Sequence, residues 1–327
     1  MDTTVLPRLD PDDLRRRPAA YRPPRRRRIR PLSTVVVIIL SLGLALVLAG
    51  HRWLPDVGEW TLALESFLPW LGLLSLLLLI PATRSRSFLA WTAWLVPVVV
   101  WCFVFVPAIL PGGATATGQG SLTVATQNLQ GYNGSLSASS ALIAQDADIV
   151  ALQEMKSAEA LNELAAKYPY QQQAGTVALL SKFPFKDSES LALNGFASLR
   201  SLHATVQTPS GEVSVYVVHG ASVSGGDHTA RDAMLSDLQG RVSQDTSSRL
   251  LVLGDFNAAP SDRVMDGFNQ QLQEKLASNG GFGFSWPSKF PATRPDHILS
   301  KGLNIKESSV LAPIGSDHLG LAGSFTF

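Results

Sequence analysis

Three long apolar segments in the first third of the chain constrain its fold more than any other feature. They occupy residues 34–50, 60–82 and 88–110 of a chain of 327 residues. A helix needs about 20 mostly apolar residues to cross the ~30 Å hydrocarbon core of a bilayer, and each segment approaches or exceeds that length. The sequence therefore predicts three transmembrane helices. The first and shortest could instead be a signal peptide, but Leu46-Val47-Leu48 makes a poor small-residue cleavage site.

The charges beside these segments predict their orientation. Residues 1–33 contain ten Arg and four Asp, and the short basic loop TRSRS separates the second segment from the third. Because short basic loops stay in the cytoplasm, we expect the N-terminus inside the cell and everything after Leu110 outside the plasma membrane. Residues 1–33 are themselves expected to be disordered and to bind anionic membrane lipids. Glu65 is expected at the outer interface, with a functional acid inside the membrane as the alternative.

The rest of the chain is predicted to form a linker at 111–120 and one domain at 121–327. The linker, PGGATATGQG, consists almost entirely of small residues. Residues 111–327 contain fourteen Lys and Arg against nineteen Asp and Glu, so this part of the chain is acidic. The domain has no Cys, because Cys102 in the third apolar segment is the only one in the chain. It must therefore be stable on its hydrophobic core, for which it is long enough.

Strand-like and helix-like patterns alternate along this domain. Apolar runs and period-two alternation predict strands at 121–128, 148–155, 176–184, 201–208, 213–220, 249–256, 295–301 and 321–327. Helical periodicity predicts helices at 138–147, 157–168, 229–245 and 261–278. This order of elements favours a layered α/β sandwich over a simple doubly wound sheet.

Several of the predicted strands begin or end at a polar side chain capable of chemistry. Strands of one sheet that terminate together would bring such side chains to one edge, on a rigid base. Carboxylates, amides and histidines suit a hard divalent cation such as Mg²⁺ and a phosphate. Each residue alone also has a structural explanation, such as turn formation by the Asn and Asp side chains. The residues are Asn128, Glu154, His219, Asp255, Asn257, Asp296, His297, Asp317 and His318.

From about residue 122 to residue 327 the chain resembles the endonuclease/exonuclease/phosphatase superfamily of metal-dependent phosphohydrolases. The similarity rests, in chain order, on TQNLQ, DIVALQEM, GTVALLSKFP, VVHG, LGDFNAAP, FSWP, RPDHIL and GSDHLGL. GDFN followed by a terminal SDH is the most specific part. The resemblance implies a four-layer α/β sandwich catalytic domain, here preceded by three transmembrane helices. The whole arrangement is similar to an actinobacterial subgroup that includes teicoplanin-resistance membrane proteins.

The same resemblance implies a metal site. Glu154, in the QE motif, would bind Mg²⁺ or Mn²⁺. Asn128 would help to hold the metal or the phosphate, and Asp317 would be a further carboxylate on the metal side.

The remaining motif residues are expected, by resemblance, to act on the phosphate. His219 and Asn257 would contact its oxygens, and Asp255 would handle a proton on the attacking or leaving oxygen. His318 would be the catalytic histidine, oriented by Asp296. Either Asp255 or the pair of His318 and Asp296 could activate the water.

Two departures from the family pattern bear on the substrate. Val217 stands where many members have Asn, and the domain lacks the long insertions with which nucleases of the family grip a duplex. The acidic domain has no Lys/Arg cluster with interleaved aromatics, which disfavours duplex DNA. Tethering beside membrane lipids favours a lipid-linked phosphate, pyrophosphate or phosphodiester. The alternatives are an extracytoplasmic nuclease or nucleotide phosphatase and an inactive binding module, for which Val217 is the only support.

Overall fold

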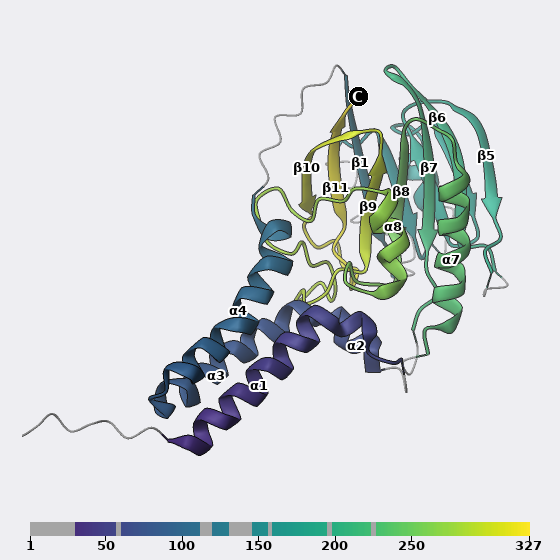
Figure 1. Ribbon diagram of the computed structural model, residues 1–327. Helices are drawn as coiled ribbons and strands as arrows, with labels where there is room; N and C mark the ends of the chain where they lie inside the picture. The colour runs from purple at the N-terminus through teal and green to yellow at the C-terminus, as the bar shows by residue number, and fades with distance from the viewer. Residues whose placement is uncertain are drawn as a thin grey trace, which may run out of the picture.

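The computed structural model shows a helical region joined to a mixed α/β domain (Figure 1). The described residues are 30–56, 60–111, 120–130, 146–155, 159–194, 198–223 and 227–327. The predicted linker at 111–120 and the predicted helix at 138–147 lie almost entirely outside these ranges.

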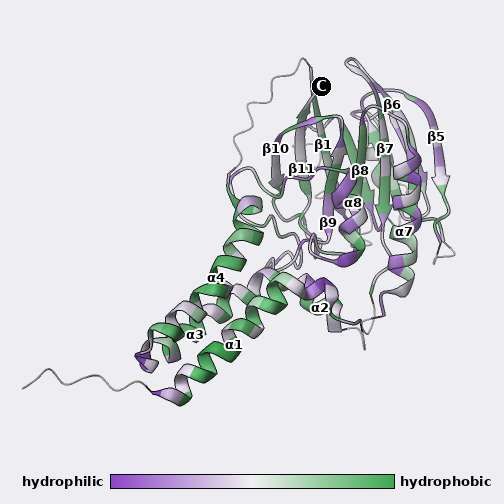
Figure 2. Cartoon of the chain, viewed as in Figure 1, coloured by the Kyte–Doolittle hydropathy of each residue, from purple (hydrophilic) through white to green (hydrophobic). Residues whose placement is uncertain are grey.

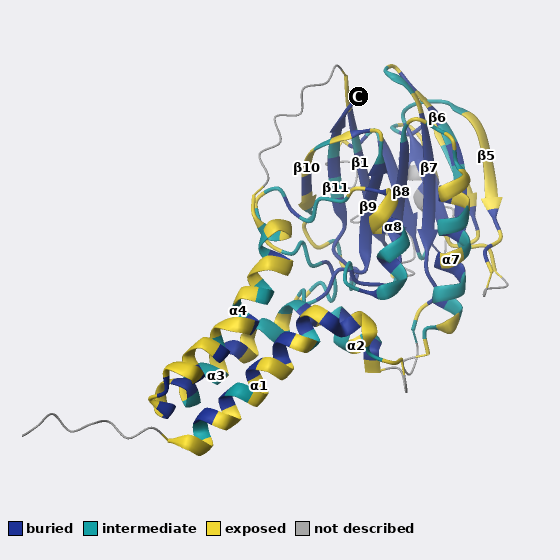
Figure 3. Cartoon of the chain, viewed as in Figure 1, coloured by how far each residue is buried: buried dark blue, intermediate teal, exposed yellow. Residues whose placement is uncertain are grey.

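The helical region contains three helices long and apolar enough to cross a membrane, as predicted. Its elements are α1 (Pro31–Gly50), η2 (His51–Trp53), α2 (Trp60–Ser66), η3 (Leu68–Leu71), α3 (Gly72–Ser85) and α4 (Phe88–Ile109). Only 28%, 22% and 22% of the residues in the apolar windows of the three candidate spans are buried. Figures 2 and 3 show that hydrophobic residues dominate α1, α3 and α4 and that much of this surface is exposed. Contact with lipid would cover such a surface.

The second apolar segment is divided in the structure. α2 ends at Ser66, and the candidate span begins at Leu68. Pro69, near the start of η3, has no N–H with which to continue the helical hydrogen bonds of α2. Glu65 therefore lies in α2, outside the candidate span, where it is buried and forms an ion pair with Arg263 of the α/β domain.

The α/β domain contains a six-stranded sheet and a five-stranded sheet. The first has the order β10-β11-β1-β2-β4-β3, and the second has the order β5-β6-β7-β8-β9. The strands of the first are β1 (Ser121–Asn128), β2 (Ile149–Gln153), β3 (Tyr170–Ala174), β4 (Val177–Ser181), β10 (Asn304–Val310) and β11 (Leu321–Thr326). Those of the second are β5 (Phe185–Leu191), β6 (Ser201–Thr208), β7 (Gly211–His219), β8 (Leu250–Asp255) and β9 (Asp296–Lys301).

The two sheets and their covering helices form the predicted four-layer sandwich. Apolar residues of both sheets make a shared core, for example Val124 and Ile149 with Val215 and Leu251. Helices α7 (Thr229–Gln244) and α8 (Asp266–Gln271) pack on the outer face of the second sheet, and α6 (Glu159–Leu164) packs on that of the first. The strands of both sheets are thereby held in register, which fixes where their polar ends lie.

The predicted helix at 261–278 is wrong over its second half. Only η4 (Arg263–Met265) and α8 are helical, and Gln273 then pairs with Ser300 as an isolated bridge. The next residue, Glu274, enters a buried ion pair with Arg294. These tertiary contacts override the helical periodicity of the segment.

Strands β3, β5 and β10 were not apparent in the sequence. All three are edge strands, and most of their residues are exposed or half-buried. A strand with so few buried residues has little of the apolar alternation by which strands are predicted.

Candidate active site

The candidate site lies where strands of both sheets end together. Parallel pairing of β7 with β8 places His219 opposite Asp255, and antiparallel pairing with β9 places Asp255 opposite Asp296. In the other sheet, Asn128 at the end of β1 lies opposite Gln153 at the end of β2. Figure 1 shows that this edge of the sandwich faces the helical region. The strand ends thus converge, but from two sheets rather than from the single sheet on which the sequence prediction was based.

Asn128 connects two carboxylates at the centre of the site. Its Nδ2 donates to Oε1 of Glu154 at 3.1 Å and to Oδ2 of Asp255 at 2.8 Å. Its Oδ1 accepts from the backbone N–H of Gln130 at 2.8 Å. Asn128 therefore presents its amide nitrogen to the two acids and holds them close together. Its part in holding a metal or phosphate stays a prediction.

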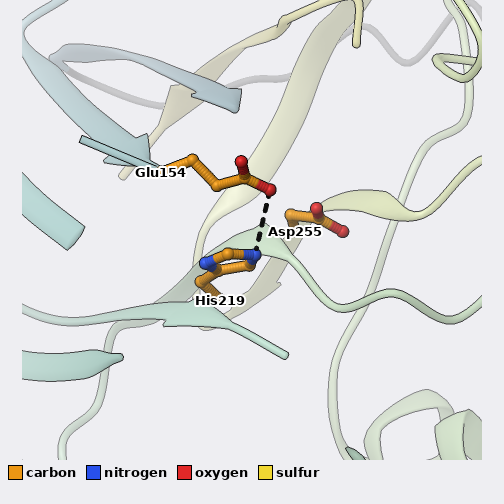
Figure 4. Close-up of side chains that lie close together, drawn as sticks. All are labelled: Glu154, His219 and Asp255. Atoms are coloured by element: carbon orange, nitrogen blue, oxygen red, sulfur yellow. Dashed lines mark ion pairs between the residues drawn. The ribbon is translucent and has the colours of Figure 1, made fainter. Parts of the chain in front are cut away.

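Glu154 and His219 face each other across the site (Figure 4). His219 Nε2 lies 3.5 Å from Glu154 Oε1, and this contact, against the opposing effect of burial, lowers the pKa of Glu154 to about 2. Arg200 Nη2 lies 2.7 Å from Nδ1 and 2.6 Å from Nε2 of the same imidazole. Glu154 also has a left-handed backbone, with φ of 55°, a strained conformation typical of functional positions. The carboxylate is thus ionised and aimed into the site.

His318 and Asp296 form a buried pair beside Asp255. His318 Nδ1 lies 2.9 Å from Asp296 Oδ2, which also accepts from Ser285 Oγ at 2.6 Å. His318 Nε2 lies 3.7 Å from Asp255 Oδ2. Burial alone would lower the pKa of His318, but the charges of Asp296 and Asp255 raise it to about 10. The structure therefore brings together the predicted imidazole and its predicted orienting carboxylate.

Asp255 is buried, and the imidazole of His318 lies beside both Asp255 and Asp296. Burial and the nearby charge of Asp296 raise the pKa of Asp255. Its Oδ1 accepts from the backbone N–H of Asn257 at 2.8 Å, and Asn257 Nδ2 donates to the carbonyl of Gly220 at 3.1 Å. These bonds hold the Asn257 loop against the end of β8. A buried carboxyl with a raised pKa is suited to exchange protons.

Asp317 lies at the margin of this cluster. Its Oδ2 accepts from Trp286 Nε1 at 3.3 Å, and its backbone N–H donates to Gln130. Within the described residues, its carboxylate does not belong to the groups whose ligand atoms converge. The predicted metal role of Asp317 stays a prediction.

The donor set fits a divalent cation. Ligand atoms of Glu154, His219 and Asp255 all lie within 4.8 Å of one another, and so do those of Asp255, Asp296 and His318. Carboxylate oxygens are ligands for hard ions such as Mg²⁺ and Mn²⁺, and imidazole nitrogens are ligands for ions such as Zn²⁺ and Fe²⁺. The buried Oδ1 of Asp296 has no hydrogen-bond partner within the described residues, so the second group still has an unused acceptor.

A cavity of about 320 Å³ opens beside the cluster, and its walls come from both parts of the molecule. His318, Asn257 and Trp286 line it from the α/β domain. Leu62 and Ser66 of α2 line it from the helical region. We call this space the catalytic cavity.

Residues 125–318 match the endonuclease/exonuclease/phosphatase family. The chain belongs to this family. Members are metal-dependent phosphoesterases and nucleases, and this chain has a cluster of acidic residues and histidines that could bind a metal ion. No curated protein sequence matches the chain.

Solved structures of other proteins show the same fold as this family member. A humanized TDP2 of D. rerio is 16% identical with a TM-score of 0.54, over 63% of this chain and 99% of that one. A 3′ phosphatase, NExo, from Neisseria bound to a product DNA hairpin is 20% identical with a TM-score of 0.52, over 63% and 100%. The human Nocturnin catalytic domain with bound sulfate is 20% identical with a TM-score of 0.50, over 63% and 94%.

The sequence left several residues of this family member's site unassigned. Arg200, just before β6, contacts His219, and Ser285 bonds to Asp296. Ser285 and Trp286 fall in the FSWP motif, which could have suggested a place in the site but not a role. Nothing in the local sequence marks Arg200, which reaches His219 only because β6 and β7 pair.

Proposed function

We propose that the chain is a membrane-anchored, divalent-metal-dependent phosphohydrolase that acts on a lipid-linked phosphate, pyrophosphate or phosphodiester outside the cytoplasmic membrane. The observation that carries this proposal is the catalytic cavity. Its one wall holds His318 and Asn257, and its other wall is α2, which leads directly into a candidate membrane span. A phosphate at this site would lie beside the membrane surface rather than in open solvent.

The positions of the charged groups support the predicted orientation. Arg30 precedes α1, and Arg84 and Arg86 lie at the turn between α3 and α4. The backbone N–H of Arg30 donates to the carbonyl of Ser85, so these basic positions share one end of the helical region. The α/β domain lies at the other end (Figure 1). With the basic end in the cytoplasm, the catalytic cavity would open outside.

The side chains suggest how hydrolysis proceeds. A water oxygen attacks phosphorus in line while the bond from phosphorus to the leaving oxygen breaks. The proton lost by the water and the proton gained by the leaving oxygen exchange with Asp255 and His318, and Asp296 keeps the imidazole in position. Glu154, with His219 and Asp255 nearby, would hold a divalent cation, which would supply the positive charge that stabilises the phosphate oxygens.

A second candidate is an extracytoplasmic nuclease or nucleotide phosphatase. It is favoured by the similarity in fold to the Neisseria 3′ phosphatase bound to a DNA hairpin. The excess of acidic residues after residue 110 disfavours it, since duplex binding depends on neutralising phosphates with Lys and Arg. An inactive binding module is disfavoured by the intact cluster. Val217, its only support, packs in the core between the sheets.

The test uses the full chain in lipid nanodiscs with Mg²⁺ or Mn²⁺. The substrates are a polyprenyl pyrophosphate, a phospholipid, single- and double-stranded DNA, and a nucleotide. Turnover of a lipid substrate supports the proposal, and turnover of DNA alone would replace it with the nuclease. Metal binding without turnover of any substrate would favour the binding module. Glu154→Ala and His318→Ala serve as the inactive controls.

A further inference from the structure

Two more cavities follow the catalytic cavity toward the membrane. A junction cavity of about 210 Å³ lies between the helical region and the α/β domain. A groove of about 350 Å³ lies between α3 and α4, which we call the lipid-facing groove. The catalytic and junction cavities share wall residues Ser66, Ala259 and Thr293. The junction cavity and the groove share Pro69, Phe282 and Phe284.

The lipid-facing groove is apolar and partly open. Leu73 and Leu76 of α3 line it and are 53% and 61% exposed. Trp70 and Trp101 also line it, and their indole N–H groups donate to the carbonyls of Ala292 and Pro69. With these donors occupied, the rings present apolar faces to the groove.

The α/β domain itself supplies one wall of the groove. Phe282 packs at 5.9 Å from Phe105 of α4, and Phe284 stacks at 5.7 Å on Trp70, measured between ring centroids. The two phenylalanines stack on each other at 5.1 Å. A loop of the catalytic domain therefore inserts into the helical region, and the groove is not a simple gap between two helices.

Ion pairs hold the cavities in this arrangement. Glu65 of α2, itself buried, accepts from Arg263 Nη2 at 2.7 Å and from the Arg263 backbone N–H at 3.0 Å. Arg52 pairs with Asp266 at the surface of the same junction. A partly buried charged contact of this kind fixes the geometry of the two parts.

The position of the lipid-facing groove within the membrane-spanning region indicates that a hydrocarbon chain occupies it. It lies between two candidate membrane spans, where hydrocarbon chains are the surrounding medium. To bring a lipid phosphate up to His318, the first part of its chain must leave the bilayer. Each methylene group that this exposes to water weakens binding about fourfold. A mostly apolar path of adjoining cavities would reduce that loss.

We propose that the hydrocarbon chain of the substrate lies in the lipid-facing groove and the junction cavity while its phosphate occupies the catalytic cavity. This inference rests on the proposed function and extends it, because it makes the helical region part of the substrate site. The recognised ligand is a phosphate carrying a long, unbranched or isoprenoid chain. Leu73, Leu76 and the two phenylalanines are the residues that select for the chain.

The first experiment measures kcat/KM of the full chain in nanodiscs for 4-nitrophenyl phosphodiesters whose second substituent is methyl or hexadecyl. We expect a clear preference for the hexadecyl ester. Leu76→Trp, which fills the groove with an apolar ring, lowers the hexadecyl-to-methyl ratio about tenfold. Leu77→Trp is the matched control: Leu77 lies on the same helix, is 64% exposed and lines none of the three cavities. It leaves the ratio unchanged. An unchanged ratio in Leu76→Trp would overturn the inference.

The second experiment does not depend on turnover. Hexadecyl phosphate with a diazirine at its chain end is photo-crosslinked to the same nanodiscs, and labelled peptides are mapped by mass spectrometry. Labels on α3, α4 and residues 282–284 that unlabelled hexadecyl phosphate competes away support the groove. Labels spread evenly over the outer faces of α1, α3 and α4, without competition, refute it. If the groove is labelled but neither ester is cleaved, the proposed reaction fails while the chain-binding site stands.

Discussion

Two buried clusters of carboxylate and histidine lie on opposite faces of β9, and they differ in how their charges are balanced. Consecutive residues of a strand point to opposite faces. Asp296 accordingly contacts His318 in the catalytic cluster, whereas His297 contacts Glu274 on the other side. Glu274 also bonds to Arg294, and both of these side chains are buried.

The pKa values of the buried acids Glu274 and Asp255 shift in opposite directions in the two clusters. Burial would raise the pKa of Glu274, but His297 and Arg294 lower it to about 2. In the cluster around His318, burial and the charge of Asp296 raise the pKa of Asp255, although His318 and His219 oppose the shift. The first cluster is a balanced structural unit. The second is poised to accept a cation or to move a proton, and incomplete balance of charge distinguishes the functional cluster.

The largest expected effect is a loss of enzymatic activity when residues of the catalytic cluster, but not of the Glu274 cluster, are substituted. Glu154→Gln and His318→Ala should each lower kcat by about 10³-fold, since they remove a metal ligand and a proton-transfer group. Near-native circular dichroism should accompany the loss. Glu274→Gln should reduce the activity of the folded fraction far less. Activity retained in both catalytic variants would contradict the site assignment.

The next effect concerns stability. Glu274→Gln should lower the free energy of unfolding by about 3 kcal/mol, because it leaves Arg294 buried without its carboxylate partner. Urea unfolding of the full chain in detergent, followed by intrinsic fluorescence, measures the change. Glu154→Gln provides the comparison and should cost much less. Equal losses in the two variants would mean that both clusters are structural.

The same cluster should produce a pH dependence. The folded-state pKa of Glu274, about 2, lies below its ordinary value of 4.5. Its contribution to stability is therefore complete above about pH 4.5 and is lost as the pH falls from there toward 2. The difference in unfolding free energy between wild type and Glu274→Gln should shrink over this range. A constant difference would refute the depressed pKa.

The smallest expected effect is stabilisation by a bound metal ion, which tests whether the negative charges around Glu154 and Asp255 are incompletely balanced. Mn²⁺ at about 100 times its Kd should stabilise the wild type by about 2.7 kcal/mol, and a chelator should reverse this. Glu154→Gln should lose most of the stabilisation, whereas Glu274→Gln should keep it. The measurement is the melting temperature with and without metal. Equal stabilisation of Glu154→Gln would place the ion elsewhere.

Much of the site could be predicted because the signal is local. Buried strands such as 249–256 are continuously apolar, so the polar residues where they end stand out. Family motifs then distinguished Asp296 from the neighbouring His297, which strand alternation places on the other face. Arg200 and Ser285 could not be assigned, since each acts through a partner from another segment. The prediction of a helix over the second half of 261–278 was wrong for the same reason: the conformation there depends on a partner from another segment, since Glu274 forms an ion pair with Arg294.

The sequence by itself determined the apolar helices, the order of the buried strands, and the residue types available for phosphate chemistry. These properties depend on composition and short-range periodicity, which can be recognised in the amino-acid sequence alone. Only the tertiary structure decided that the catalytic edge faces α2 and that Glu65 pairs with Arg263 across the junction. It also decided that Phe282 enters the helical region. Such contacts join residues far apart in the chain, and packing, not local propensity, selects them.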